Sequence, residues 1–254
     1  MLLAIDIGNT NIVLGVYREE ELVACWRLAT DVHKMADEYA VLLNSLFSNE
    51  GLSKSEIKGS AISCVVPPLL PIFQEVCGEH LQVEPLVVGP GIRTGVRILI
   101  DNPRELGADR IVNAIAARRL YATPAIVIDF GTATTFDVVS REGDYLGGAI
   151  APGIGISAET LYRQAAQLPR IELALPKKVI GKNTVAAMQS GVLFGYVALV
   201  EGMVERIKEE LGEETKVIAT GGLAGVIAGE TSAIQVVNLN LTLEGLRLIY
   251  EMNK

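Results

Sequence analysis

The feature that most constrains the fold of this chain is a short pattern that occurs twice. Residues 2–7 are apolar except for Asp6, and the chain then turns through Gly8 into a second apolar run. Residues 125–130 repeat this arrangement, with Asp129 near the end of the run and Gly131 two residues later. Two unrelated turns seldom share an aspartate at the end of a buried strand and a glycine two positions on. The repetition indicates an internal duplication with two facing hairpins.

The elements expected around the two hairpins follow a similar order. Alternating and apolar runs predict strands, and apolar residues at a spacing of three and four predict helices. In the first half we expect strands at 2–7, 11–17, 21–28, 61–66 and 85–89, with helices at 35–46 and 71–81. In the second half we expect strands at 125–130, 134–140, 145–150 and 216–219, with helices at 155–167, 184–210 and 242–252. This order predicts an α/β fold of two lobes, 1–115 and 116–254, joined within 100–124 by a helix over 109–121.

Composition excludes several classes of protein. Half of the 254 residues are hydrophobic and one fifth are charged, which favours two packed lobes over disorder. The net charge is −8 with scattered basic residues, so nucleic-acid binding is not expected as the main activity. We expect a cytoplasmic protein without a membrane span, because no signal peptide precedes the first strand and no apolar run reaches transmembrane length. With only 3 Cys, widely spaced, and 2 His, neither a disulfide framework nor a zinc site is expected.

The two turns carry the chemistry of phosphate binding. Glycine allows the backbone to approach a ligand closely, and short polar side chains follow it at Asn9, Thr10 and Asn11. Asp6 can hold hydrated Mg²⁺, which uses few carboxylates together with phosphate oxygens and water. In the second turn Thr132 and Thr135 supply hydroxyls, and Asp129 supplies a second charge for a cation. Either turn alone is explained by ordinary turn chemistry, but the repetition favours phosphate binding.

Two further segments are candidates for a site. Gly221 and Gly222 follow a short buried strand, where a flat ring such as adenine can lie against the backbone, although a plain strand-to-helix turn also explains them. Between the lobes, Asn102 and Pro103 predict a helix start. Asp109 either caps the next helix or accepts a proton from an attacking hydroxyl, as phosphoryl transfer requires.

Other kinase signatures are absent. The sequence contains no Gly-x-x-x-x-Gly-Lys-Ser/Thr motif, which excludes a P-loop kinase. Residues 129–131 read Asp-Phe-Gly, but they lie in a strand hairpin and no His-Arg-Asp catalytic loop accompanies them, so a protein kinase is excluded as well.

These motifs, taken in order, resemble those of the type III pantothenate kinases. The matching segments are 6–10, 107–110, 129–135, 147–153, 181–184 and 221–222, and the resemblance extends to 245–247. It implies the duplicated actin-like, or ribonuclease H-like, fold of the acetate-and-sugar-kinase superfamily, with a mixed sheet flanked by helices in each lobe. It also implies transfer of the γ-phosphoryl group of ATP to the primary hydroxyl of pantothenate, giving 4′-phosphopantothenate for coenzyme A synthesis.

The resemblance also assigns residues. Asp109 is implied as the general base, Asp6 as the Mg²⁺ site and Asp129 as the site of a monovalent cation, K⁺ or NH₄⁺. Pantothenate is implied to contact Ile100, Gly107, Ala108, Asp109, Arg110 and Thr184. ATP is implied to contact Asp6, Ile7, Gly8, Asn9, Thr10, Asn11, Ile12, Val13, Gly131, Thr132, Gly221 and Gly222. Ile100 stands where many relatives carry tyrosine, and Thr184 is alternatively a helix cap.

Family members are homodimers, so the resemblance implies a homodimer here, and the glycines between 191 and 203 suit close helix packing within or between subunits. Three other functions stay open. Some relatives are described as accessory factors for gene expression, but Asp6, Asp109, Arg110, Asp129 and Thr132 are all present here. A kinase for another small hydroxylated acid and an actin-like filament protein are the remaining alternatives.

Overall fold

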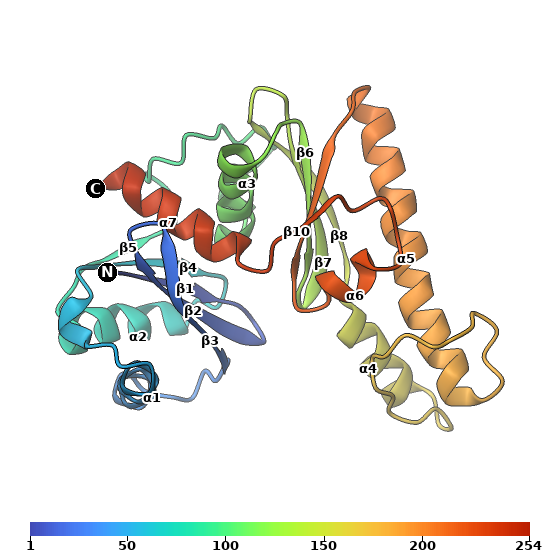
Figure 1. Cartoon of the computed structure of the whole chain (residues 1–254), viewed down its shortest axis with the longest axis horizontal. Coiled ribbons are helices and arrows are strands. Elements are labelled where there is room, and N and C mark those ends of the chain that lie inside the picture. The colour runs from blue at the N-terminus through green and yellow to red at the C-terminus, as the bar shows by residue number, and fades with distance from the viewer. The chain divides into compact units, whose positions relative to one another are not determined.

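The computed structural model describes residues 1–254, which divide into two compact units. Unit 1 comprises 1–97, 101–116 and 240–254, and unit 2 comprises 98–100 and 117–239. The predicted lobes, 1–115 and 116–254, differ from these units chiefly at the end of the chain. Residues 240–254 pack with the first sheet, because helix α7 (Leu241–Asn253) lies against β1, β2 and β4 (Figure 1).

Unit 1 is built on a five-stranded mixed sheet in the order β3-β2-β1-β4-β5. Its strands are β1 (Leu2–Ile7), β2 (Asn11–Arg18), β3 (Glu21–Ala29), β4 (Gly59–Cys64) and β5 (Pro85–Val87). The first three form an antiparallel meander, while β4 and β5 run parallel to β1. The carboxyl ends of β1 and β4 therefore meet at one edge of the sheet.

The two faces of this sheet are covered differently. Helices α1 (Ala36–Asn49) and α2 (Leu69–Glu75) contribute Leu43 and Phe73 to an apolar core that also holds Ile5 and Ile62 of the sheet. Small residues on the sheet allow α7 to approach closely. A Cβ on Gly59 would lie 1.9 Å from the hydroxyl of Tyr250 on α7, so any larger residue would displace that side chain.

Unit 2 repeats this topology strand for strand, in the order β8-β7-β6-β9-β10. The strands are β6 (Ala125–Phe130), β7 (Ala133–Val139), β8 (Tyr145–Pro152), β9 (Lys216–Gly221) and β10 (Val236–Val237). Again the first three are antiparallel, and β9 and β10 run parallel to β6. The predicted internal duplication is present in both strand order and strand direction.

The helices of unit 2 are α4 (Ile154–Gln164), α5 (Thr184–Leu211) and α6 (Ala224–Ala228), and α3 (Ala108–Leu120) continues from unit 1 into unit 2. Helix α5 alone has the length and hydropathy of a membrane span, with 44% of its most apolar window buried. One face of α5, including Leu193 and Val200, lies in the core of unit 2.

Candidate functional site

The first predicted turn lies at the carboxyl end of β1. Asp6 pairs with Val13 across the hairpin, and the N–H of Gly8 donates to the carbonyl of Asn11 over 3.0 Å. Asn9 and Thr10 are exposed at the tip, whereas Asp6 is half-buried at the strand end. The turn thus has exposed polar residues at its tip beside one half-buried aspartate.

The side chains of Ile7 and Ile12 do not belong to this exposed tip. Both are fully buried in the core of unit 1, and they pair with each other across the hairpin. Their predicted contact with ATP is therefore restricted to their backbone atoms.

Asp109 lies at the same edge of the sheet as the first turn. The N–H of Val65, just after β4, donates to the carbonyl of Ile7 over 3.0 Å. A Cβ on Gly107 would lie 3.6 Å from Cγ1 of Val65 and 2.5 Å from Oδ1 of Asp109. Gly107 thus allows the start of α3 to pack against the strand ends with the Asp109 carboxylate folded over it.

The surroundings of Asp109 shift its pKa. Oδ1 of Asp109 accepts the N–H of Arg110 over 2.8 Å in the first turn of α3. Burial raises the pKa of Asp109 above its usual value, and it outweighs the hydrogen bond and the positive charge of Arg110, which lower it. A carboxylate with a raised pKa is a stronger proton acceptor, as a general base requires.

The segment just before α3 forms a short helix of its own. Residues 103–105 form a single 3₁₀ turn capped by Asn102, whose side chain accepts the N–H of Arg104 over 3.3 Å. The predicted arrangement of Asn102, Pro103 and Glu105 at a helix start is confirmed, and Nδ2 of Asn102 also donates to Glu105 over 2.7 Å.

The second turn repeats the first in unit 2. Asp129 is half-buried at the end of β6, and Gly131 and Thr132 are exposed at the tip. The N–H of Gly131 donates to the carbonyl of Ala133 over 3.1 Å. Gly221 has φ +90°, and a Cβ there would lie 2.6 Å from Oδ1 of Asp129, so glycine is required where β9 ends beside this carboxylate.

Three other predicted residues also fall in unit 2. Gly222 is exposed directly after Gly221. Thr184 is exposed as the first residue of α5, and it is not the cap, because Oδ1 of Asn183 accepts the N–H of Ala186 over 2.8 Å. Ile100 lies with β8, where its Cγ2 would be 3.6 Å from a Cβ on Gly147.

The predicted site residues therefore form one group in each unit. Unit 1 holds the turn at 6–13 and the segment 107–110, while unit 2 holds Ile100, Asp129, the turn at 131–132, Thr184 and residues 221–222. No group of three or more His, Cys, Asp or Glu side chains could hold a metal ion without other ligands. Asp6 and Asp129 fit cations that are completed by phosphate oxygens and water, as Mg²⁺ prefers.

The structure adds one supporting residue to each turn, Thr30 and Gly153, and neither was among the predicted site residues. The N–H of Thr30, just after β3, donates to the carbonyl of Thr10 over 3.0 Å. The N–H of Gly153, just after β8, donates to the carbonyl of Thr132 over 3.1 Å. Because β3 and β8 are equivalent third strands, both turns are held from the same position of the duplicated fold. Gly153 ends the motif at 147–153, whereas only the internal repeat could have directed attention to Thr30.

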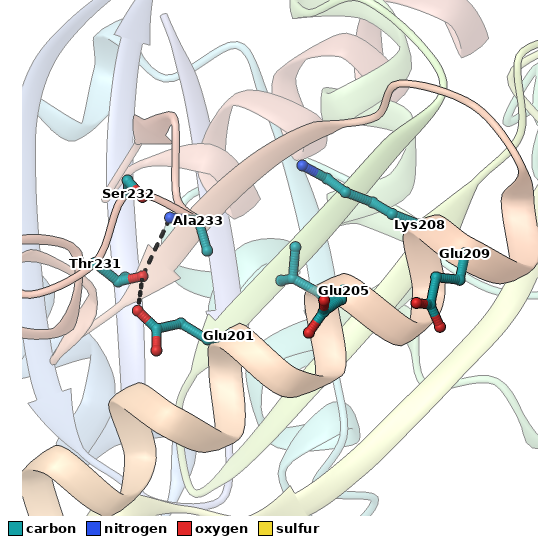
Figure 2. A pocket seen from close by; sticks show the side chains of 8 residues that line it. Glu201, Glu205, Lys208, Glu209, Thr231, Ser232 and Ala233 are labelled. Atoms are coloured by element: carbon teal, nitrogen blue, oxygen red, sulfur yellow. Dashed lines mark hydrogen bonds between the residues drawn. The ribbon is translucent and has the colours of Figure 1, made fainter.

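A separate groove lies on unit 2, between α5 and residues 231–233. Figure 2 shows Glu201, Glu205 and Glu209 along α5, with Lys208 as the one cation in the lining. Glu201 accepts the hydroxyl of Thr231 over 2.8 Å, which ties the loop to the helix. Three carboxylates disfavour an anionic ligand, and no predicted site residue lines the groove.

Comparison with known proteins places the chain in a family. The model of the family described as type III pantothenate kinase matches residues 2–206. A type III pantothenate kinase from Roseiflexus sp. (strain RS-1) is 59% identical over 254 residues, covering 100% of both chains.

Solved structures show the fold. A protein described as a Baf family transcriptional activator from Campylobacter jejuni has a TM-score of 0.63 at 19% identity, covering 99% of this chain and 98% of its own. The inorganic polyphosphate/ATP-glucomannokinase from Arthrobacter sp. strain KM has a TM-score of 0.53 at 16% identity, covering 99% of this chain and 98% of its own. At these identities the likeness concerns architecture alone, and it confirms the predicted duplicated actin-like fold.

Proposed function

This chain belongs to the type III pantothenate kinase family, and from that premise we propose that Asp109 is the general base of its reaction. The chain is a kinase that phosphorylates pantothenate with ATP, in the synthesis of coenzyme A. In the proposed step Asp109 accepts the proton of the pantothenate hydroxyl as that oxygen forms a bond to the γ-phosphorus. The bond from the γ-phosphorus to the β,γ-bridging oxygen breaks, and ADP leaves with the electron pair.

The observation that carries this proposal is the setting of Asp109. Its carboxylate lies over Gly107 at the edge of the sheet where the first turn begins, and burial raises its pKa. Arg110 follows it in the chain and suits the carboxylate of pantothenate, since its guanidinium can pair with that group in a bidentate manner. Gly107, Ala108, Ile100 and Thr184 complete the proposed contacts to pantothenate.

The proposed nucleotide contacts use both turns. Backbone amides and hydroxyls at 8–11 and at 131–132 receive the phosphates, with Gly221 and Gly222 beside the adenine. Asp6 would hold Mg²⁺, which neutralises charge on the phosphates. Asp129 would hold a monovalent cation, K⁺ or NH₄⁺, and its half-buried carboxylate at a strand end supports this role.

The experiment that tests these roles is ADP release with ATP, Mg²⁺ and pantothenate, in KCl and in NaCl. We expect turnover that depends on K⁺ in the native protein, and loss of turnover in Asp109→Asn. Asp129→Asn should lose the difference between KCl and NaCl. Turnover that survives in Asp109→Asn would contradict the role of Asp109 as the general base. An unchanged difference between KCl and NaCl in Asp129→Asn would contradict the role of Asp129 as the cation site.

We also propose a cytoplasmic homodimer. Cβ atoms on Gly191 and Gly195 of α5 would meet nothing within 4 Å in this chain, so the surface of α5 at these two glycines is open for a partner helix. Apolar side chains stand exposed near the start of α5, including Ile180 at 83% and Val179 at 65%. Light scattering should give the mass of a dimer, and Gly195→Arg should give a folded monomer; a native monomer would contradict the proposal.

A further inference from the structure

Each turn is hydrogen-bonded to a short backbone segment at the end of the third strand, Thr30–Asp31 in unit 1 and Pro152–Gly153 in unit 2. We call these two segments corners, and each of them is hydrogen-bonded to a buried tyrosine. In unit 1 the hydroxyl of Tyr39, on α1, donates to the carbonyl of Asp31 over 2.9 Å. The same hydroxyl accepts the N–H of Asp31 over 3.3 Å. Tyr39 is fully buried, and its ring packs on Phe73 with centroids 4.7 Å apart. The backbone at Asp31 is thereby tied to the core of unit 1.

The corner at Asp31 acts on the first turn through its neighbour Thr30. The N–H of Thr30 donates to the carbonyl of Thr10 over 3.0 Å, and its hydroxyl donates to the carbonyl of Gly8 over 2.6 Å. Two carbonyls of the turn are thus tied to the residue next to the one that Tyr39 holds. Asn9, Thr10 and Asn11 at the turn tip are exposed, so a ligand can reach them.

Unit 2 has the same arrangement, built from different residues. The hydroxyl of Tyr196, on α5, donates to the carbonyl of Pro152 at the end of β8, and it pairs with Oγ of Ser157 on α4 over 2.7 Å. Tyr196 is 8% exposed and lies in the core of unit 2. The next residue, Gly153, donates its N–H to the carbonyl of Thr132 over 3.1 Å.

The two tyrosines come from helices at different places in the order of elements, yet both act near the end of the third strand of their sheet. Tyr39 lies on α1, the first helix after β3, and Tyr196 lies on α5, the second helix after β8. Each hydroxyl bonds the backbone within two residues of the end of that third strand, at Asp31 and at Pro152. A hydroxyl in a buried site fixes the position of its partners, because leaving them unpaired there is costly. Loosening a supporting contact by about 1 Å is enough to degrade a site.

From this duplicated arrangement we propose that Tyr39 and Tyr196 are positioning residues, which preorganise the two turns for the phosphates of ATP. The proposal rests on the proposed function, since it takes both turns to bind the nucleotide. Neither tyrosine contacts the turn itself: each acts through the corner residue, Thr30 or Gly153, whose N–H holds the turn.

The test compares Tyr39→Phe and Tyr196→Phe with Tyr17→Phe. Phenylalanine keeps each ring, so packing is preserved and only a hydroxyl is lost. Tyr17 is the matched control, because its hydroxyl is also buried but has no hydrogen-bond partner, and it pairs with Leu2 at the opposite end of the hairpin from the turn. We expect each of the first two variants to raise KM for ATP about threefold to tenfold, the range of one hydrogen bond. KM for pantothenate should not change in any of the three.

Hydrogen exchange supplies a readout that does not depend on activity. The amide of Thr30 should exchange faster in Tyr39→Phe, and the amide of Gly153 should exchange faster in Tyr196→Phe, each without acceleration in the other unit. Thr30→Val should raise KM for ATP, and Thr30→Ser, which keeps the hydroxyl, should restore it.

Two outcomes separate this proposal from the assignment of the turns. Thr132→Val removes the turn's own hydroxyl, so an unchanged KM for ATP in that variant contradicts the proposed nucleotide contact. If Thr132→Val raises KM while Tyr39→Phe and Tyr196→Phe leave KM and amide exchange unchanged, the turn assignment stands and the positioning role is overturned. An equal rise in KM in Tyr17→Phe overturns it too.

Discussion

Gly153 is where a single added methyl group should disturb the second turn most. Its backbone has φ −72° and ψ 156°, which alanine adopts without strain, so any cost comes from contacts alone. A Cβ at this position would lie 2.1 Å from the carbonyl oxygen of Thr132 and 2.7 Å from that of Gly131. Both atoms belong to the backbone of the turn and cannot rotate away as a side chain would.

The size of the disturbance follows from these distances. Real Cβ contacts essentially never fall below 3.0 Å, so the turn or the corner must move by about 0.9 Å, the difference between 3.0 Å and 2.1 Å. Overpacking of this kind costs roughly 1–3 kcal/mol, and the strained hydrogen bond from Gly153 to Thr132 costs about 1 kcal/mol more. Replacing glycine by alanine also stabilises the protein by about 0.4–1 kcal/mol, because alanine lowers the conformational entropy of the unfolded chain. We expect Gly153→Ala to lower the free energy of unfolding by about 2 kcal/mol.

The effect on catalysis should be larger than the effect on stability. A displacement near 1 Å at a site that positions reacting groups costs on the order of a hundredfold in rate. ADP release at varied ATP should therefore show kcat/KM about a hundredfold lower in Gly153→Ala, and urea unfolding gives the stability.

Gly155 supplies the matched control, two residues further on. A Cβ there would meet nothing within 4 Å, and the residue lies in the first turn of α4. Gly155→Ala should keep kcat/KM and raise stability by up to about 1 kcal/mol. Native kcat/KM and native stability in Gly153→Ala would refute the reasoning about the turn.

Four further substitutions have definite expected outcomes. Asp109→Asn should lower kcat by about a hundredfold or more. Because burial raises the pKa of Asp109, its ionised form destabilises the fold above that pKa. Urea unfolding of Asp109→Asn at neutral pH should therefore show no loss of stability, and a loss would contradict the burial argument. Gly221→Ala combines φ +90° with a contact of 2.6 Å to Asp129, and should cost roughly 2–4 kcal/mol in thermal unfolding; a native melting temperature would contradict this. Asn183→Ala should lose the cap of α5 at a cost of about 1 kcal/mol, whereas Thr184→Ala should raise KM for pantothenate with little change in stability; the reverse pattern would identify Thr184 as structural.

Strand and turn positions were predictable because they depend on local pattern. The two apolar runs that contain Asp6 and Asp129 are each followed by turn residues, and the structure contains β1 and β6 with the bounds expected of them. The helix predicted at 184–210 corresponds to α5 (Thr184–Leu211), since one apolar stripe continues through it. The strand β10 (Val236–Val237) was not predicted, because two residues carry no periodic signal.

Long-range packing was not predictable from the same patterns. An apolar stripe indicates that α7 is covered, but it does not say by which sheet, and the helix packs in unit 1 although it follows β10 of unit 2. The hydrogen bonds that Thr30 and Gly153 make to the turns join residues about twenty positions apart, and neither residue type is unusual at a strand end. The alternative assignment of Thr184 as the cap of α5 was wrong, because the adjacent Asn183, also a good capping residue, occupies that position.

The measurement that tests the central claim most directly is identification of the product by mass spectrometry, with the native protein and with Asp109→Asn at equal ATP and pantothenate. Binding of both ligands to each protein is measured alongside by calorimetry. We predict that the native protein forms phosphopantothenate and ADP in equal amounts, while Asp109→Asn binds both ligands and forms almost no product. Phosphopantothenate formed by Asp109→Asn at the native rate would contradict the account of the site.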